Sequence, residues 1–172
     1  MFFTVFITFV IIQRIIEVII AKRNERWSKE HGAVEFGTEH YKYIVALHIL
    51  FFVSLIIEYR LKPELINGWQ IFLLVFICAQ LLRYWSLFSL GKLWNTKILV
   101  IPNTPPVTKG PYRLMKHPNY LVVALEILII PLMFGAYVTA IIFSLLNFFL
   151  LYFYRIPQEE AALKFLRLPN EK

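Results

Sequence analysis

The side chains best able to do chemistry lie in two short polar segments that border strongly apolar stretches. The first is GPYRLMKHPNY at residues 110–120, and the second is RIPQEEAAL at residues 155–163. His117 has an ordinary pKa near neutrality, so it can hydrogen-bond or exchange a proton under cellular conditions. Arg155 carries a planar guanidinium that can hold a carboxylate through two parallel hydrogen bonds. These residue types suit the binding and orientation of a polar or anionic ligand.

The loop that carries the first segment is rigid. It holds five of the nine prolines within 17 residues, at positions 102, 105, 106, 111 and 118. Proline fixes φ and drives the preceding residue toward extended geometry, so this loop is stiff and irregular. Irregular backbone at membrane depth is tolerated where it is buried in protein or lines a cavity. The alternative is a basic interfacial loop that leads into a helix with Pro118 at its first position.

The composition indicates an integral membrane protein. The chain has 172 residues, 59% of them hydrophobic, including 16 Phe, which is more apolar surface than a soluble domain of this length can bury. A soluble all-α protein is the weaker alternative. Apolar runs fall at about residues 2–21, 43–58, 69–90, 121–134 and 136–154. They predict an all-α membrane fold with about five transmembrane helices in a single domain, residues 1–172, with N-terminal helices over 1–93 and a catalytic region over 94–165.

The last two apolar runs predict a helical hairpin. Pro131 is expected to break the first helix, and Gly135 is expected to make the turn. The hairpin returns the chain to the side from which it entered, so the two polar segments are predicted to emerge together. His117 and Arg155 are therefore expected to be neighbours, although 38 positions separate them.

The charge distribution predicts an orientation in the membrane. The net charge is +7, and most Lys and Arg residues fall after the first run, in the 92–116 loop and in the tail. Only Arg60 and Lys62 fall in the loops of the opposite face. The positive-inside rule then puts the N-terminus outside and the C-terminus in the cytoplasm. Topology and anionic lipid account for the basic character, so no nucleic-acid partner is expected.

Polar residues inside the apolar runs are expected to face the bundle or a cavity. Arg14 and Glu17, three positions apart, are expected to pair and to mark a retained helix rather than a cleaved signal peptide. Glu126 is expected either to pair with Arg83 or to line a cavity that binds the substrate. Cys78 is expected to be a small packing residue. No metal site is expected, because His31, Glu35 and His40 do not have the spacing of a metal-ligand set.

The two polar segments, separated by the length of a hairpin, strongly resemble the isoprenylcysteine carboxyl methyltransferase family of membrane enzymes. The resemblance covers about residues 94–165. The stretch RNERWSKEHGAVEFGTEHY at residues 23–41 is similar to a bacterial branch of the family, in which some members methylate lipophilic polyketides such as alkylpyrones. The chain departs from the family pattern in two places. PQEE follows Arg155 where eukaryotic members have several consecutive glutamates, and the stretch before Pro105 also diverges.

The resemblance implies a bacterial membrane enzyme that uses S-adenosylmethionine as methyl donor and acts on a lipophilic acceptor. It places Arg155 as the catalytic residue that faces the acceptor. The cofactor contacts that it implies are Thr104, Pro105, Pro106, Val107, Tyr112, His117, Pro118, Asn119, Tyr120 and Glu159. A soluble methyltransferase would use a glycine-rich turn for this purpose. All six glycines of this chain are isolated, so the stiff loop is the expected substitute.

The implied chemistry suits these side chains. A carboxylate or enolate acceptor is already anionic, so it needs a cation to orient it more than it needs a strong base. Arg155 can supply that cation, and Glu159 can pair with the ammonium of the donor. Two alternatives remain. One is an NADPH-binding membrane reductase that uses Lys97, Lys109, Arg113 and Lys116 for a phosphate. The other is a non-catalytic lipid-binding protein.

Overall fold

The computed structural model describes residues 1–165 and confirms the all-α membrane fold. Within residues 1–165, four helical stretches are long and apolar enough to cross a bilayer, and a shorter apolar helix accompanies them. The main helices are α1 (Phe2–Glu30), α2 (Thr38–Leu61), α3 (Trp69–Leu90), α4 (Pro118–Met133) and α5 (Tyr137–Leu150). A π-helical turn, η3 (Leu151–Arg155), and the helix α6 (Ile156–Phe165) continue from α5.

The described chain forms two compact units. Unit 1 contains residues 1–38 and 90–106 together with the chain from residue 158 onward. Unit 2 contains residues 39–89 and 107–157. Unit 1 therefore holds α1 and most of α6, whereas unit 2 holds α2, α3, α4 and α5. The sequence-based expectation of one domain over the whole chain stays a prediction.

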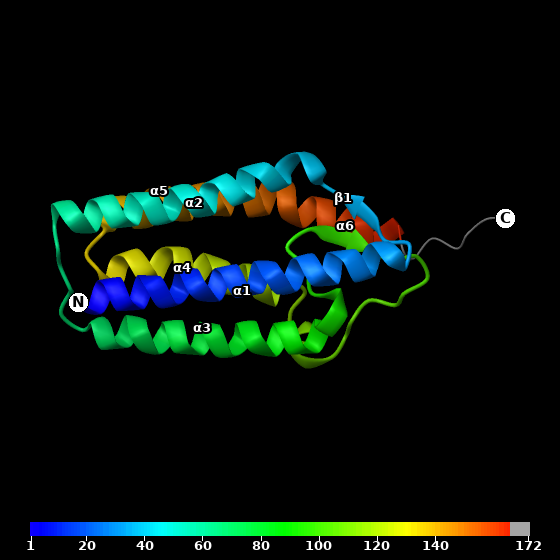
Figure 1. The fold of residues 1–172 in the computed structure, drawn as a ribbon, viewed down its shortest axis with the longest axis horizontal. Helices are drawn as coiled ribbons and strands as arrows, with labels where there is room; N and C mark the ends of the chain where they lie inside the picture. Colours follow the sequence, from blue (N-terminus) through cyan, green and yellow to red (C-terminus); the bar gives the residue numbers. More distant parts are fainter. Residues whose placement is uncertain (166–172) are drawn as a thin grey trace. The chain divides into compact units, whose positions relative to one another are not determined.

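Unit 1 is built on the long helix α1 and a small antiparallel sheet (Figure 1). Strand β1 (Val34–Phe36) pairs with β2 (Ile98–Val100), so that Glu35 lies opposite Leu99. Both strands contain β-branched residues, which favour extended backbone. Ile98 and Val100 pack with Ala162 of α6, and Phe36 covers them. These contacts give unit 1 an apolar core outside its membrane-spanning helix.

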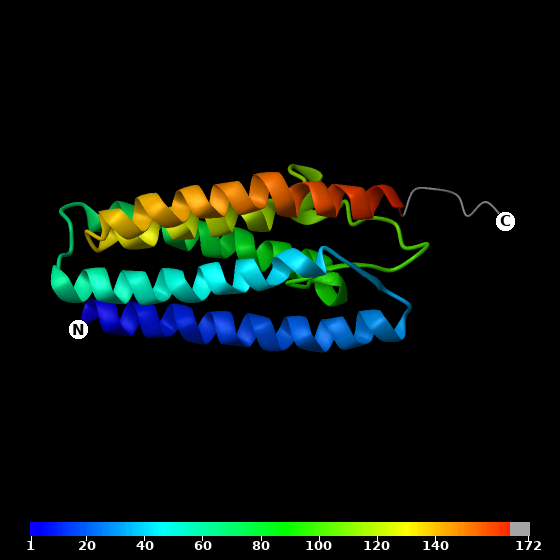
Figure 2. The same cartoon turned by 90° about the horizontal axis from the view of Figure 1, so that it is seen from above.

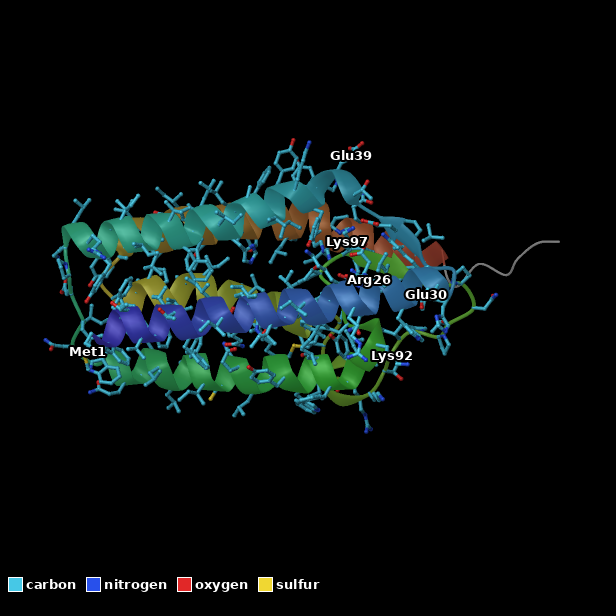
Figure 3. All side chains as sticks on the ribbon, viewed as in Figure 1. Met1, Arg26, Glu30, Glu39, Lys92 and Lys97 are labelled. Atoms are coloured by element: carbon cyan, nitrogen blue, oxygen red, sulfur yellow. The ribbon has the colours of Figure 1, made fainter. Side chains whose placement is uncertain are left out.

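The segment that precedes β2 is fastened to α1. It includes the 3₁₀ turn η1 (Gly91–Leu93). The side-chain amide of Asn24 donates to the carbonyl oxygens of Gly91, at 3.2 Å, and Trp94, at 2.8 Å. The amide of Asn95 donates to the carbonyl of Ala21 at 3.3 Å. Figure 3 shows Arg26, Glu30, Lys92 and Lys97 at the end of α1 opposite Met1, so unit 1 concentrates its charge at this end.

Unit 2 is a helical bundle whose members are linked by polar contacts, which are buried at Glu126 and more exposed at Glu58. On α3 and α4, Gln80 and Arg83 both bond the carboxylate of Glu126. On α2, the carboxylate of Glu58 accepts hydrogen bonds from the first N–H groups of α5, at Val138 (3.0 Å) and Thr139 (2.8 Å). A carboxylate at a helix N-terminus satisfies donors that the helix itself leaves open. Glu58 therefore caps α5 from the neighbouring helix.

The α4–α5 hairpin turns where the sequence predicted it (Figure 2). Gly135 has a φ of +66°, and the N–H of Ala136 reaches back to the carbonyl of Pro131 at 2.9 Å. Gly135 N–H bonds the carbonyl of Leu132 at 3.2 Å, which completes a Schellman turn. The predicted break at Pro131 is wrong, because α4 continues to Met133. Pro131 lies in the last turn, where its carbonyl accepts the bonds that close the helix.

Two further sequence-based expectations concern single side chains in the spanning helices. Arg14 and Glu17 form the predicted ion pair on α1. Cys78 is exposed on α3, so its expected role as a packing residue inside the protein is wrong. The predicted orientation also used two cations of the tail, Arg167 and Lys172, which lie outside the described residues.

Candidate active site

The loop that bears the first polar segment is docked tightly against α3. Gly110 opens the 3₁₀ turn η2 (Gly110–Arg113) with a φ of +59°. A Cβ atom at Gly110 would overlap the hydroxyl of Ser89 and lie 3.1 Å from the indole nitrogen of Trp85. Glycine alone therefore permits this approach. The next residue, Pro111, is fully buried, so the start of η2 is packed inside the protein.

The loop ends at the first turn of α4. His117 is the N-cap residue, and Pro118 occupies the first helical position, as the sequence predicted. The ring of His117 stacks on the ring of Tyr120, with centroids 5.1 Å apart and planes at 12°. Both ring nitrogens of His117 are buried. Tyr112, in η2, is half-buried. The helix start therefore holds two aromatic rings of the predicted cofactor set in one fixed stack.

Arg155 completes this group within unit 2. It is the last residue of the π-helical turn η3 and is only 8% exposed. Its Nε donates a hydrogen bond to the hydroxyl of Tyr120 at 3.0 Å. Single π-helical turns occur frequently at functional sites because they shift the side chains that follow. The prediction that the two polar segments meet is confirmed, since Arg155 reaches His117 through Tyr120.

Asn119 adds an acceptor beside the stacked rings. Its Oδ1 is buried and receives no hydrogen bond from any residue that the structure describes. A buried acceptor without a donor costs about 1–3 kcal/mol. S-adenosylmethionine carries several donors, including an ammonium group, ribose hydroxyls and an exocyclic amine. The donor set of this ligand therefore fits the residues at the start of α4.

The remaining predicted cofactor contacts divide between the units. Val107 is half-buried at the start of the loop in unit 2. Thr104, Pro105 and Pro106 follow β2 in unit 1, where Thr104 N–H bonds the carbonyl of Ile101 at 3.2 Å. Asn103 has a φ of +61° in this turn and Pro102 precedes it, as in a type II turn. Glu159 lies half-buried in the first turn of α6.

Glu126 has a clear structural partner. Its carboxylate is buried against Arg83 and Gln80, so the predicted ion pair with Arg83 is confirmed. Charges buried in a membrane protein are paired because an isolated charge there is costly. Whether Glu126 also contacts a substrate stays a prediction.

The sequence did not predict which residues of α3 lie against the loop. Ser89 and Trp85 lie close to Gly110, but the sequence did not predict this contact because both residues belong to an apolar helical run. The sequence does carry one signal of this contact. A glycine that directly precedes a proline, at the end of a proline-rich stretch, indicates that another part of the chain approaches the glycine backbone closely. The sequence predicted that the segments of Tyr120 and Arg155 lie close together, but it did not predict the hydrogen bond between these two side chains.

Comparison with known proteins agrees with this geometry. The model of the isoprenylcysteine carboxyl methyltransferase (ICMT) family matches residues 71–165, which is more than half of the chain. This chain belongs to that family. The matched region contains the docked loop, the hairpin, Arg155 and Glu159. The protein is thus a membrane methyltransferase by family.

Its relatives are similar over nearly their whole length. The uncharacterized protein YpbQ of Bacillus subtilis (strain 168) is 50% identical over 163 residues, covering 94% of this chain and 96% of the relative. An uncharacterized protein of Haemophilus influenzae (strain ATCC 51907 / DSM 11121 / KW20 / Rd) is 26% identical over 155 residues, covering 89% and 90% of the two chains. No solved structure matches the chain.

Proposed function

We propose that this member of the ICMT family transfers a methyl group from S-adenosylmethionine to an acidic oxygen of a lipophilic acceptor in the membrane. The acceptor oxygen is a carboxylate or an enolate. The observation that carries the proposal is the group formed by Arg155, Tyr120 and His117, which joins both family segments in one place.

The residues near the start of α4 support the donor assignment. S-adenosylmethionine supplies, when bound, an electrophilic methyl group on a sulfonium. The buried Oδ1 of Asn119 can accept a hydrogen bond from one of its donor groups. Glu159 is proposed to pair with its ammonium, and the stiff turn at Thr104, Pro105 and Pro106 is proposed to contact it. A rigid loop loses little conformational entropy when it orders around a ligand.

Arg155 is proposed to orient the acceptor. Methyl transfer is an in-line displacement, which is fast when the nucleophile is held in line with the methyl group. The hydroxyl of Tyr120 fixes the Nε edge of the guanidinium, so the planar fork has few orientations. A fork fixed in this way can hold an anionic oxygen through charge-assisted bonds. The acceptor gains the methyl group, and no proton has to move because the oxygen is already ionised.

The proposed cellular setting is a bacterial membrane, with the N-terminus outside and the C-terminus in the cytoplasm. The clustering of Lys and Arg in alternate loops supports this orientation. The methyl donor is water-soluble and would then reach the loop and tail from the cytoplasm. The acceptor, being lipophilic, would enter from the bilayer.

Calorimetry on the purified full-length protein tests the donor assignment. We expect binding of S-adenosylmethionine and of its demethylated product, and no binding of NADPH. Binding of NADPH alone would overturn the proposal in favour of a reductase, and binding of none of the three would favour a non-catalytic protein. Incubation of bacterial membrane lipids with a labelled methyl donor then identifies the acceptor by the labelled product.

A further inference from the structure

We propose that the exposed cations around the end of α1 form a binding surface for the headgroups of anionic phospholipids. This basic surface consists of Lys22, Arg23, Arg26 and Lys92, all of them exposed and all within unit 1. It contains none of the residues of the candidate active site and does not depend on the proposed reaction.

The length of α1 puts these cations at the depth of the headgroups. The apolar part of the helix, residues 2–21, is about 30 Å long at 1.5 Å per residue, which equals the thickness of the hydrocarbon core. Lys22 is the first residue beyond it, and Arg26 follows one turn later. The side chains of both therefore project into the layer that contains phosphate groups.

A tryptophan and a second chain segment complete the surface. The ammonium of Lys92, on η1, lies over the ring of Trp27 at 5.0 Å from its centroid. Trp27 lies four positions after Arg23 and so shares its face of α1. The bonds from Asn24 to Gly91 and Trp94 hold η1 in this position. Tryptophan is enriched at the membrane–water interface, which agrees with the depth given by the helix length.

The nearby acidic residues do not neutralise these cations. Glu25 accepts hydrogen bonds from Lys29, at 2.6 Å, and Lys97, at 2.8 Å, and Glu35 pairs with the same two lysines. Glu30 is exposed one turn beyond Arg26. In residues 1–165, none of the four cations of the basic surface forms an ion pair. The surface therefore presents positive charge that matches a phosphodiester.

The test compares lipid binding by the full-length protein and its variants. Native mass spectrometry in mild detergent measures retention of phosphatidylglycerol against phosphatidylcholine, and thermal shift measures the affinity for each. Each cation near an anionic membrane contributes about fivefold in affinity, so R23Q/R26Q should lose about 25-fold of the preference for phosphatidylglycerol. The matched control, R60Q/K62Q, removes two cations outside the basic surface and should change the preference less than twofold.

Three results would overturn the proposal. The first is an unchanged preference in R23Q/R26Q, and the second is an equal loss in the control. The third is a preference in the wild type that does not weaken when salt rises from about 50 to 500 mM, because headgroup attraction to exposed cations is screened. If R23Q/R26Q does not fold, K92Q and the salt titration test the proposal instead. K92Q should lose about fivefold of the preference for phosphatidylglycerol.

Discussion

The hydrogen bond from Arg155 Nε to the hydroxyl of Tyr120, at 3.0 Å, joins two segments that lie 35 positions apart in the chain. Tyr120 stacks in turn on His117. Arg155 belongs to the turn that follows α5, and Tyr120 to the first turn of α4. The hairpin thus brings its two outer ends together, and a tyrosine connects the proposed acceptor-binding cation to the proposed donor-binding loop.

Replacing Tyr120 with Phe should lower turnover without unfolding the protein. Y120F keeps the ring that stacks on His117 but removes the acceptor of the Arg155 bond. A hydrogen bond to a charged group contributes about 1.5–3 kcal/mol, so kcat/KM should fall by about ten- to a hundredfold. Transfer of label from S-adenosylmethionine to membrane lipid measures this. Y152F, at an exposed tyrosine, is the control and should keep full activity.

Replacing Gly110 with Ala should displace the loop. The added Cβ would overlap Ser89, and the φ of +59° is strained for any side chain. Gly68 offers a matched control, because it has a φ of +80° and no atom lies within 4 Å of the position that a Cβ would take there. G68A should cost only the backbone strain, about 1 kcal/mol. G110A should cost more than this in thermal stability and should also weaken donor binding in calorimetry.

A G110A protein with the stability and donor affinity of G68A would show that the close approach to Ser89 does not position the loop. The double variant S89A/G110A adds a second check. It removes the hydroxyl that the new Cβ meets, so it should recover part of the donor affinity while the backbone strain remains.

The buried pair of Arg83 and Glu126 yields a test that separates structure from substrate binding. E126Q leaves the guanidinium of Arg83 buried without its carboxylate, which should destabilise the protein by about 3–5 kcal/mol. The double variant R83M/E126L removes both charges and should recover most of that stability. Thermal unfolding in detergent measures both effects. If R83M/E126L is stable but has a raised KM for the acceptor, Glu126 also contacts the substrate.

The sequence predicted the arrangement of the two polar segments better than it predicted the contacts that support them. The apolar runs located the long apolar helices of residues 1–165 because burial in lipid requires long apolar segments. The hairpin, which returns the chain to the side from which it entered, implied that the segments of His117 and Arg155 are neighbours. The end of α1 was missed, since Lys22–Glu30 is charged, yet good helix formers and the Glu25–Lys29 pair extend the helix to Glu30. The pairing of β1 with β2 joins three-residue strands far apart in the chain, which no local pattern reveals.

Lys97 provides a prediction on pH. The hydrogen bond from its ammonium to Glu25 is the largest cause that raises the pKa of Lys97 above its ordinary value of 10.5. Burial lowers the pKa by less than this, and the hydrogen bond to Glu35 adds a still smaller rise. A raised pKa means that the charged lysine stabilises the fold fully below pH 10.5 and that this contribution is lost as the pH rises through the folded-state pKa. The contribution of such a pair is about 0.5–1 kcal/mol.

The measurement is the difference in thermal stability between the wild type and K97Q from pH 8 to pH 11.5. The difference should be constant up to about pH 10 and should shrink above pH 10.5. Taking the difference cancels the titration of the other lysines and tyrosines. A difference that stays constant to pH 11.5, or that shrinks toward lower pH, would contradict the assignment.

Replacing Arg155 should lower turnover, whereas replacing Glu159 should lower donor affinity. If Arg155 orients an anionic acceptor, R155A should keep donor affinity nearly intact and lose turnover, and R155K should not recover it fully because an ammonium cannot reproduce the planar fork. If Glu159 holds the ammonium of the donor, E159A should weaken donor binding by about 1.5–3 kcal/mol, or about ten- to a hundredfold. Calorimetry measures donor affinity and label transfer measures turnover. The competing account is an ion pair between the two side chains without any ligand. In that case both alanine variants would lose thermal stability together, the folded fraction of each would bind the donor normally, and neither residue would belong to the site.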